Sequence, residues 1–258
     1  MSLVEWERKE GISVLTLNRP EVHNALNLPS LEELSRVTGE LRHSKATRVV
    51  VVTGAGEKAF CAGADLKERR GFTQDQVRRY IHTIRETFQA LSRLPQPVIA
   101  AVNGVALGGG MELALACDLR VADEHAVFGL TETSLGIIPG AGGTQHLARL
   151  IGKARAKELI FTARRLTARE AEEMGMLNRV VEGGTVMEAA MEMATRINEN
   201  APLALAQAKH AIDYGTETDL DTGLAIETKA YEVLIPTKDR LEGLAAFKEK
   251  RKPIYLGE

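Results

Sequence analysis

The feature that most constrains the fold is the run RVVVVT at Arg48–Thr53. Consecutive β-branched residues favour a strand, and a strand without polar alternation has to be covered on both faces. A second apolar run follows at Val98–Val102, and Gln74–Leu94 between them has the apolar spacing of a long helix. This alternation indicates an α/β domain in which helices bury the strands.

Other segments extend this pattern and divide the chain. We expect strands at Gly11–Asn18 and Leu119–Ala122, and helices from Pro29 to Leu41 and over Gly110–Cys117. Beyond about Gly142 almost everything reads as helix, apart from a short strand near Leu177–Val181. The Gly183–Gly184 pair is the best boundary. We therefore predict a catalytic core over residues 1–183 and a region of three or four helices over 184–258.

Composition limits the class of protein. The chain has 258 residues, 44% hydrophobic and 26% charged, which is typical of a globular protein. Its net charge of −2 gives no global signal for nucleic acid. The segment Met1–Glu10 is charged and has no secretory apolar region, and no run is long enough to cross a membrane. We expect a cytoplasmic protein, or one in the mitochondrial matrix if a eukaryotic transit peptide was removed.

Several kinds of site are excluded by spacing. The two cysteines, Cys61 and Cys117, have no metal-type spacing and are expected to be reduced thiols. The six histidines are scattered, so no metal site is expected. The glycines at 108–110 do not complete a dinucleotide motif, because Leu113 stands where its last glycine belongs. A phosphate-binding loop and a serine-hydrolase elbow are also missing.

Two glutamates stand in glycine-rich surroundings. Glu112 follows the run Ala106–Met111 and enters an apolar helix, where a carboxylate is usually paired, exposed or functional. Glu132 lies between two threonines, where a lone glutamate is most often solvated. Together, two carboxylates can move protons next to a carbonyl group.

Two segments offer backbone amides to such a carbonyl. The turn at Gly108–Gly110 opens a helix, so an amide there, which we assign to Gly109, has no intrahelical partner and can bind an oxyanion. Alternatively, these glycines could have a purely structural role and only allow tight packing where the strand meets the helix. In Phe60–Lys67, small residues follow a buried strand and leave the backbone open to a ligand. Taken alone, this segment reads as an ordinary loop.

These residues resemble the crotonase family, the enoyl-CoA hydratase/isomerase superfamily, over nearly the whole chain. The matching segments share order and spacing with that family: Leu17–Pro20, Asn24–Leu26, Phe60–Lys67, Ala100–Gly104, Leu107–Ala114, Cys117–Asp118, Phe128–Gly129, Glu132, Leu135–Gly136, Pro139–Gly140 and Gly142–Gln145. The resemblance implies a crotonase-like spiral of ββα units with a C-terminal helical trimerisation region. It also implies a homotrimer, or a hexamer built as a dimer of trimers.

The resemblance implies an acyl-CoA thioester as substrate and no metal or redox cofactor, since coenzyme A is part of the substrate. The thioester oxygen would be held by the amides of Ala64 and Gly109. The implied substrate and coenzyme A contacts are Ala62, Ala64, Asp65, Leu66, Lys67, Gly109, Gly140, Phe247 and Lys250. Phe247 and Lys250 belong to a segment that would reach the coenzyme A of a neighbouring subunit.

The same resemblance assigns the chemistry. Glutamate at both catalytic positions is the pattern of hydratases, so we expect an enoyl-CoA hydratase, a carbon–oxygen lyase of fatty acid metabolism. Glu112 would activate water for addition at C3 and Glu132 would give a proton to C2, although the division of roles stays open. The segments Ala156–Phe161 and Ile235–Gly243 are most similar to methylglutaconyl-CoA hydratases of leucine breakdown, some of which bind AU-rich RNA. That substrate is the alternative.

Two other functions compete with this one. The basic residues Lys67, Arg69, Arg70, Arg78 and Arg79 could contact RNA phosphates, but Glu68 and Asp75 interrupt them and no common RNA-binding motif is present. We therefore expect no primary nucleic acid function, with secondary RNA binding left open. A non-catalytic acyl-CoA binder is the third reading, and two intact glutamates argue against it.

Overall fold

A computed structural model describes residues 2–258. Its larger sheet has six strands in the order β1 (Val4–Lys9), β2 (Ile12–Leu17), β3 (Val49–Gly54), β5 (Val98–Val102), β7 (Leu119–Asp123) and β10 (Arg179–Val181). Strands β1 and β2 form an antiparallel hairpin, and every later neighbour is parallel. All six residues of β3 are buried, as the valine run predicts.

A smaller sheet of four strands accompanies it, in the order β4 (Ala59–Cys61), β6 (Val105–Leu107), β8 (Val127–Gly129) and β9 (Leu166–Thr167). Each of the pairs β3–β4, β5–β6 and β7–β8 gives one strand to each sheet and is followed by a helix, so the chain advances as a spiral. This spiral was predicted from the family resemblance alone. None of the short strands of the smaller sheet was predicted from the sequence.

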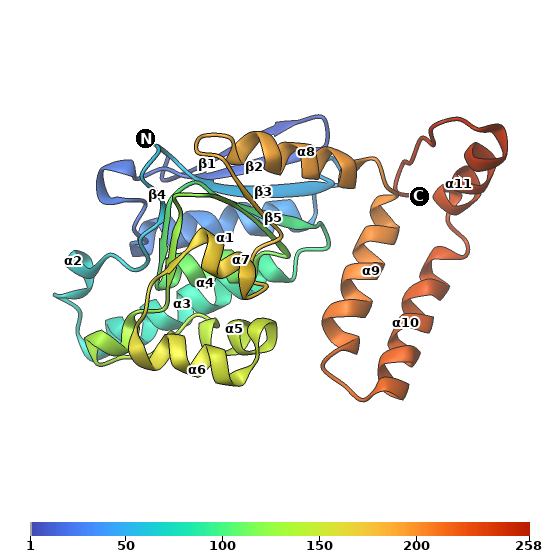
Figure 1. Cartoon of the computed structure of the whole chain (residues 1–258). Helices are drawn as coiled ribbons and strands as arrows, with labels where there is room; N and C mark the ends of the chain where they lie inside the picture. The colour runs from blue at the N-terminus through green and yellow to red at the C-terminus, as the bar shows by residue number, and fades with distance from the viewer. Residues whose placement is uncertain (1) are drawn as a thin grey trace.

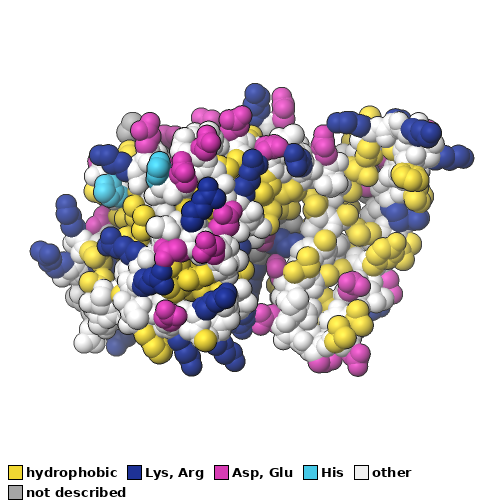
Figure 2. Space-filling model, in the orientation of Figure 1, with side chains coloured by type: hydrophobic (Ala, Val, Ile, Leu, Met, Phe, Trp, Pro, Cys, Tyr) yellow, Lys and Arg dark blue, Asp and Glu magenta, His cyan; other side chains and the backbone are white. Residues whose placement is uncertain are grey.

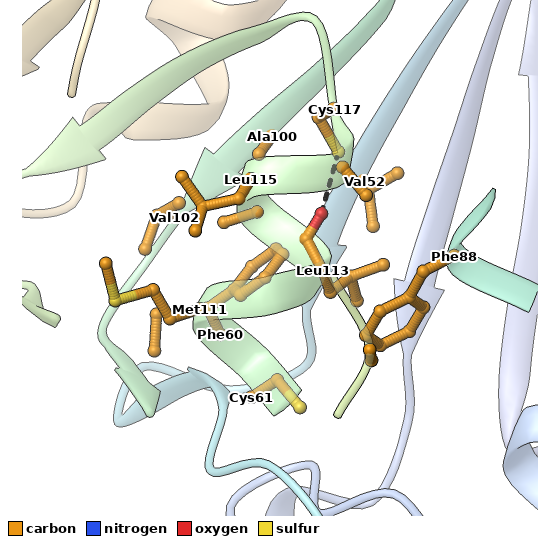
Figure 3. Close-up of a cluster of buried hydrophobic side chains, with 14 of the residues drawn as sticks. Val52, Phe60, Cys61, Phe88, Ala100, Val102, Met111, Leu113, Leu115 and Cys117 are labelled. Atoms are coloured by element: carbon orange, nitrogen blue, oxygen red, sulfur yellow. Dashed lines mark hydrogen bonds between the residues drawn. The ribbon is translucent and has the colours of Figure 1, made fainter. Parts of the chain in front are cut away.

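The helices of the spiral are α1 (Leu28–Arg42), α2 (Leu66–Arg69), α3 (Gln74–Ser92), α4 (Gly109–Ala116), α5 (Gly143–Ile151), α6 (Lys153–Thr162) and α7 (Ala168–Glu173). Two single-turn helices, η1 (Pro20–Val22) and η2 (Glu132–Leu135), connect strands to helices. All eight residues of α4 are buried. Figure 3 shows Met111, Leu113 and Leu115 of this helix among side chains from the strands, with Phe60 and Phe88 close by.

Helix α8 (Val186–Asn198) covers the larger sheet, because Ala190 and Ala194 pack with Val51 and Ile99 in a second core cluster. The chain then continues as α9 (Pro202–Gly215), α10 (Leu220–Leu234) and α11 (Lys238–Glu249), here called the arm. The arm stands to one side of the spiral (Figure 1). The region predicted to hold three or four helices after residue 184 therefore contains four, while the domain boundary itself stays a prediction.

Two further structural findings bear on the expectations from sequence. Cys61 and Cys117 are free thiols and both are buried; the Cys117 thiol lies 3.4 Å from the carbonyl oxygen of Leu113 (Figure 3). Among residues 2–258, no helix combines the length and the apolar character needed to cross a bilayer.

Candidate functional site

Glu112 lies in the first turns of α4 and is only 3% exposed. Its Oε1 accepts hydrogen bonds from the backbone N–H groups of Ala141 and Gly143, both at 2.8 Å. The Gly143 amide is available because Gly143 begins α5 and the first amides of a helix have no intrahelical partner, and the Ala141 amide lies in the turn Pro139–Gly142 before it. Gly142 makes this turn with a φ of +112°, which favours glycine.

Burial has the largest effect on Glu112 and raises the pKa of its carboxyl above the usual range. The hydrogen bonds from Gly143 and Ala141 and the charge of Arg85 act in the opposite direction and offset part of this rise. One carboxylate oxygen is therefore held in a fixed direction by two donors. A carboxylate held in this way suits a base that has to stay oriented toward one substrate atom.

Glu132 opens η2 and has a different environment. Its Oε2 is buried and has no hydrogen-bond partner within residues 2–258. Burial, with a contribution from the charge of Glu112, raises its pKa to about 7. A carboxyl with such a pKa holds a proton close to neutral pH, which suits an acid.

Gly108 makes room for the Glu132 carboxyl. A Cβ atom at residue 108 would lie 3.1 Å from Oε1 of Glu132. Gly108 also has a φ of +52°, so a side chain there would be strained as well as crowded. The glycine-rich turn before α4 therefore serves the second carboxyl as well as the helix start.

The two predicted amide segments lie side by side. A Cβ on Gly63 would be 3.1 Å from the amide nitrogen of Gly109, and a Cβ on Gly109 would be 3.7 Å from that of Ala64. Within residues 2–258, the N–H groups of Ala64 and Gly109 donate to no protein acceptor. The structure therefore brings together the two donors that the sequence analysis assigned to an oxyanion. Their role stays a prediction.

Hydrogen bonds to the backbone of Leu26 hold the loop that carries Ala64. The Leu26 amide donates to the carbonyl of Gly63 at 2.7 Å, and the Asp65 amide donates to the carbonyl of Leu26 at 2.9 Å. The hydroxyl of Tyr80 donates to the same Leu26 carbonyl at 2.8 Å. These bonds leave the amide of Ala64, which lies between them in the chain, without a partner among residues 2–258.

The other predicted contacts fall into two groups. Ala62 directly follows β4, and Asp65, Leu66 and Lys67 lie at the start of α2. There the Asp65 carboxylate caps the helix and pairs with Arg19 at 3.0 Å. Gly140 lies in the turn that holds Glu112. Phe247 and Lys250 instead belong to the end of α11, on the opposite side of the molecule from α2 (Figure 1). One chain therefore does not bring these two residues to its own amides.

The basic cluster considered for RNA is largely engaged with the protein. Arg78 pairs with Asp75 at 2.6 Å, and Arg79 pairs with Glu32 at 3.2 Å. Arg69 lies over the ring of Tyr80, 5.3 Å from its centroid. Within residues 2–258, no three His, Cys, Asp or Glu side chains gather in a way that could hold a metal ion.

The donors that hold Glu112 and the glycine that makes room for Glu132 were not identified from the sequence. Gly143 appeared only in a segment that resembles the family, and Ala141 was not singled out. The reasoning applied to the turn before α4, that glycines at a helix start free backbone amides, would have identified them as donors. Gly108 was considered only for its effect on the backbone.

Comparison with known proteins supports the resemblance. A family model described as enoyl-CoA hydratase/isomerase matches residues 7–258. The chain is 56% identical over 256 residues to YngF of Bacillus subtilis, and the aligned region covers 99% of this chain and 98% of YngF. It is 47% identical over 256 residues to human mitochondrial methylglutaconyl-CoA hydratase, covering 98% of this chain and 76% of that protein.

Among solved structures, the crystal structure of an enoyl-CoA hydratase from Bacillus anthracis matches with a TM-score of 0.98 and 54% identity. The match covers 99% of this chain and 100% of that chain. The predicted family and the predicted crotonase-like fold are both confirmed by these similarities.

Proposed function

The chain belongs to the enoyl-CoA hydratase/isomerase family, and from this premise we propose that it adds water across the C2–C3 double bond of a 2-enoyl-CoA thioester. Family members act on acyl-CoA substrates, and enoyl-CoA hydratases are carbon–oxygen lyases. The observation that carries the proposal is the pairing of two unlike carboxyls, one anchored and one with a free buried oxygen, with two free amides that lie side by side.

In the proposed mechanism, the amides of Ala64 and Gly109 donate to the thioester oxygen as negative charge develops on it. Glu112, oriented by Ala141 and Gly143, takes a proton from water, and the water oxygen bonds to C3. Glu132, whose pKa of about 7 leaves a substantial fraction of it protonated at neutral pH, gives a proton to C2. The C2–C3 double bond becomes single, and the proton count of the pair is unchanged.

The test is turnover on a panel of 2-enoyl-CoA thioesters that includes crotonyl-CoA and 3-methylglutaconyl-CoA. Hydration removes the conjugated double bond, so the absorbance of the conjugated thioester should fall, and it should fall equally in the presence of a chelator. A requirement for added metal, or no reaction with any member of the panel, would contradict the proposal.

The acyl group has one specific alternative. The likeness to human methylglutaconyl-CoA hydratase supports a branched substrate with a distal carboxylate. A role in RNA binding has weaker support, because Arg78 and Arg79 are already paired with carboxylates. Filter binding of RNA across a salt series would test it, since phosphate contacts weaken steeply as salt rises.

We also propose that the chain works as a homotrimer or a hexamer of two trimers. The arm exposes large apolar side chains, among them Tyr231 at 64%, Leu244 at 60% and Phe247 at 87%. Apolar side chains gather over the arm in Figure 2 as well. Contiguous apolar surface of this kind marks protein interfaces. In such an assembly, Phe247 and Lys250 would reach the coenzyme A of a neighbour.

A further inference from the structure

One face of α3 lies beside the candidate site. Ile84 Cδ1 lies 3.3 Å from the position that a Cβ on Gly109 would take, and Ile81 Cδ1 lies 3.3 Å from that of a Cβ on Gly140. Residues three and four apart share one side of a helix. Arg85 follows Ile84 and lies one turn after Ile81, so it continues this face beside the turn that holds Glu112.

The guanidinium of Arg85 is only partly engaged. Its Nε donates to the carbonyl of Gly140 at 3.2 Å, and this is its only hydrogen bond to residues 2–258. No carboxylate of the described chain pairs with it, whereas Arg78 and Arg79 on the same helix each have one. A guanidinium has five N–H donors, so most of those on Arg85 stay available.

Arg85 is also close enough to Glu112 for its charge to lower the pKa of that carboxyl. A second carboxylate brought beside Glu112 would raise that pKa and weaken Glu112 as a base. A cation at this place offsets the repulsion. The neighbourhood of Glu112 is therefore suited to an additional negative charge, provided that Arg85 is there to pair with it.

We propose that Arg85 determines specificity by binding a carboxylate at the distal end of the acyl group. The site would then favour 2-enoyl-CoA thioesters that end in a carboxylate over neutral ones of similar shape. In a glutaconyl group this carboxylate carbon is two bonds beyond C3, the atom to which Glu112 directs water. Planar guanidinium and carboxylate groups pair through two parallel hydrogen bonds. This inference rests on the proposed function.

Matched substrates test it. Glutaconyl-CoA is crotonyl-CoA with a carboxylate added at C4, and 3-methylglutaconyl-CoA has the same relation to 3-methylcrotonyl-CoA. For Arg85→Gln, kcat/KM should fall about ten- to a hundredfold on the two carboxylated substrates, the scale of a hydrogen bond to a charged group. The fall should be clearly smaller on the neutral ones, which lose only the effect of Arg85 on Glu112 and on the Gly140 turn. Arg85→Lys should keep part of the preference, because it keeps the charge and loses the planar geometry.

Arg78→Gln is the control, since it removes the same charge from the same helix and should leave the ratio of kcat/KM values unchanged. Equal losses on both members of a pair would show that Arg85 only holds the Gly140 turn, and would overturn the inference. Wild-type protein that hydrates crotonyl-CoA but neither carboxylated substrate would also overturn it while leaving the proposed function intact. Absence of hydration on all four substrates would instead overturn the proposed function.

Discussion

The spiral buries its apolar side chains, whereas the arm leaves many of them exposed. Helix α4 of the spiral has all of its residues buried, and it carries Glu112 at its start. In the arm, α9 has no buried residue and α10 has only Ala230. The spiral therefore completes its core and its carboxyl pair within one chain, whereas the arm leaves apolar surface to be covered. A change to a carboxyl of the spiral should therefore spare assembly, whereas a change to the arm should weaken assembly and substrate binding together.

The largest effect should come from the carboxyls. Glu112→Gln and Glu132→Gln should each lower kcat by at least about 10²-fold, the usual scale of general acid–base catalysis. The double variant should lose less than the product of the two effects, because both groups act on one substrate. Sedimentation should show unchanged assembly. Glu57→Gln, on the surface of the spiral, is the control. Normal turnover by either variant would make that glutamate structural.

The second effect should come from the arm. Deleting the residues after Ile235 removes α11 with its exposed Leu244 and Phe247, so assembly should be reduced and acyl-CoA binding weakened together. Sedimentation and titration with an acyl-CoA measure the two properties. A truncated chain that sediments as a monomer and still binds acyl-CoA normally would show that the arm contributes nothing to a neighbour's site.

A third prediction concerns pH. Burial raises the pKa of Glu132 to about 7, so its proton is present below that pH and is lost above it. Because the proposed reaction uses this proton, kcat/KM for crotonyl-CoA should fall by about tenfold at pH 8 relative to its plateau. Assembly should not follow this curve. A profile that stays flat from pH 6 to 9 would argue against Glu132 as the acid.

A smaller effect should follow from crowding Glu112. A Cβ on Gly143 would lie 3.0 Å from Cγ and from Oε1 of Glu112, so Gly143→Ala should misplace the carboxylate and lower kcat several-fold. The matched control is Gly39→Ala, in the interior of α1, where nothing lies within 4 Å. It should leave turnover unchanged and stabilise the chain by about 0.5–1 kcal/mol. Equal turnover in the two variants would show that the position of Glu112 tolerates movement.

The sequence predicts the spiral unevenly. The valine run of β3 and the periodic pattern of α3 are long enough to specify their structure. The strands of the smaller sheet have two or three residues, too few to show any period, and they form because neighbouring turns of the spiral supply their partners. Strand β1 is missed for another reason: four of its six residues are charged, and only Val4 is buried.

Some residues of the candidate site can likewise be predicted from the sequence, and others cannot. Glu112 stands out in sequence because a carboxylate on an apolar helix needs an explanation. Its donors lie 29 and 31 residues further along the chain, and no local pattern connects them to it. The position of Arg85 beside the Gly140 turn depends on the packing of α3 against the spiral, so it too requires the folded structure.

The central claim is that the carboxyl pair of the spiral adds water to a 2-enoyl-CoA. Its most direct test is to incubate the protein with crotonyl-CoA in ¹⁸O-labelled water containing a chelator, and to analyse the product by mass spectrometry. Hydration by this mechanism places one ¹⁸O atom in a hydroxyl group at C3. A product without ¹⁸O, whether unchanged substrate or one with a shifted double bond, would contradict it.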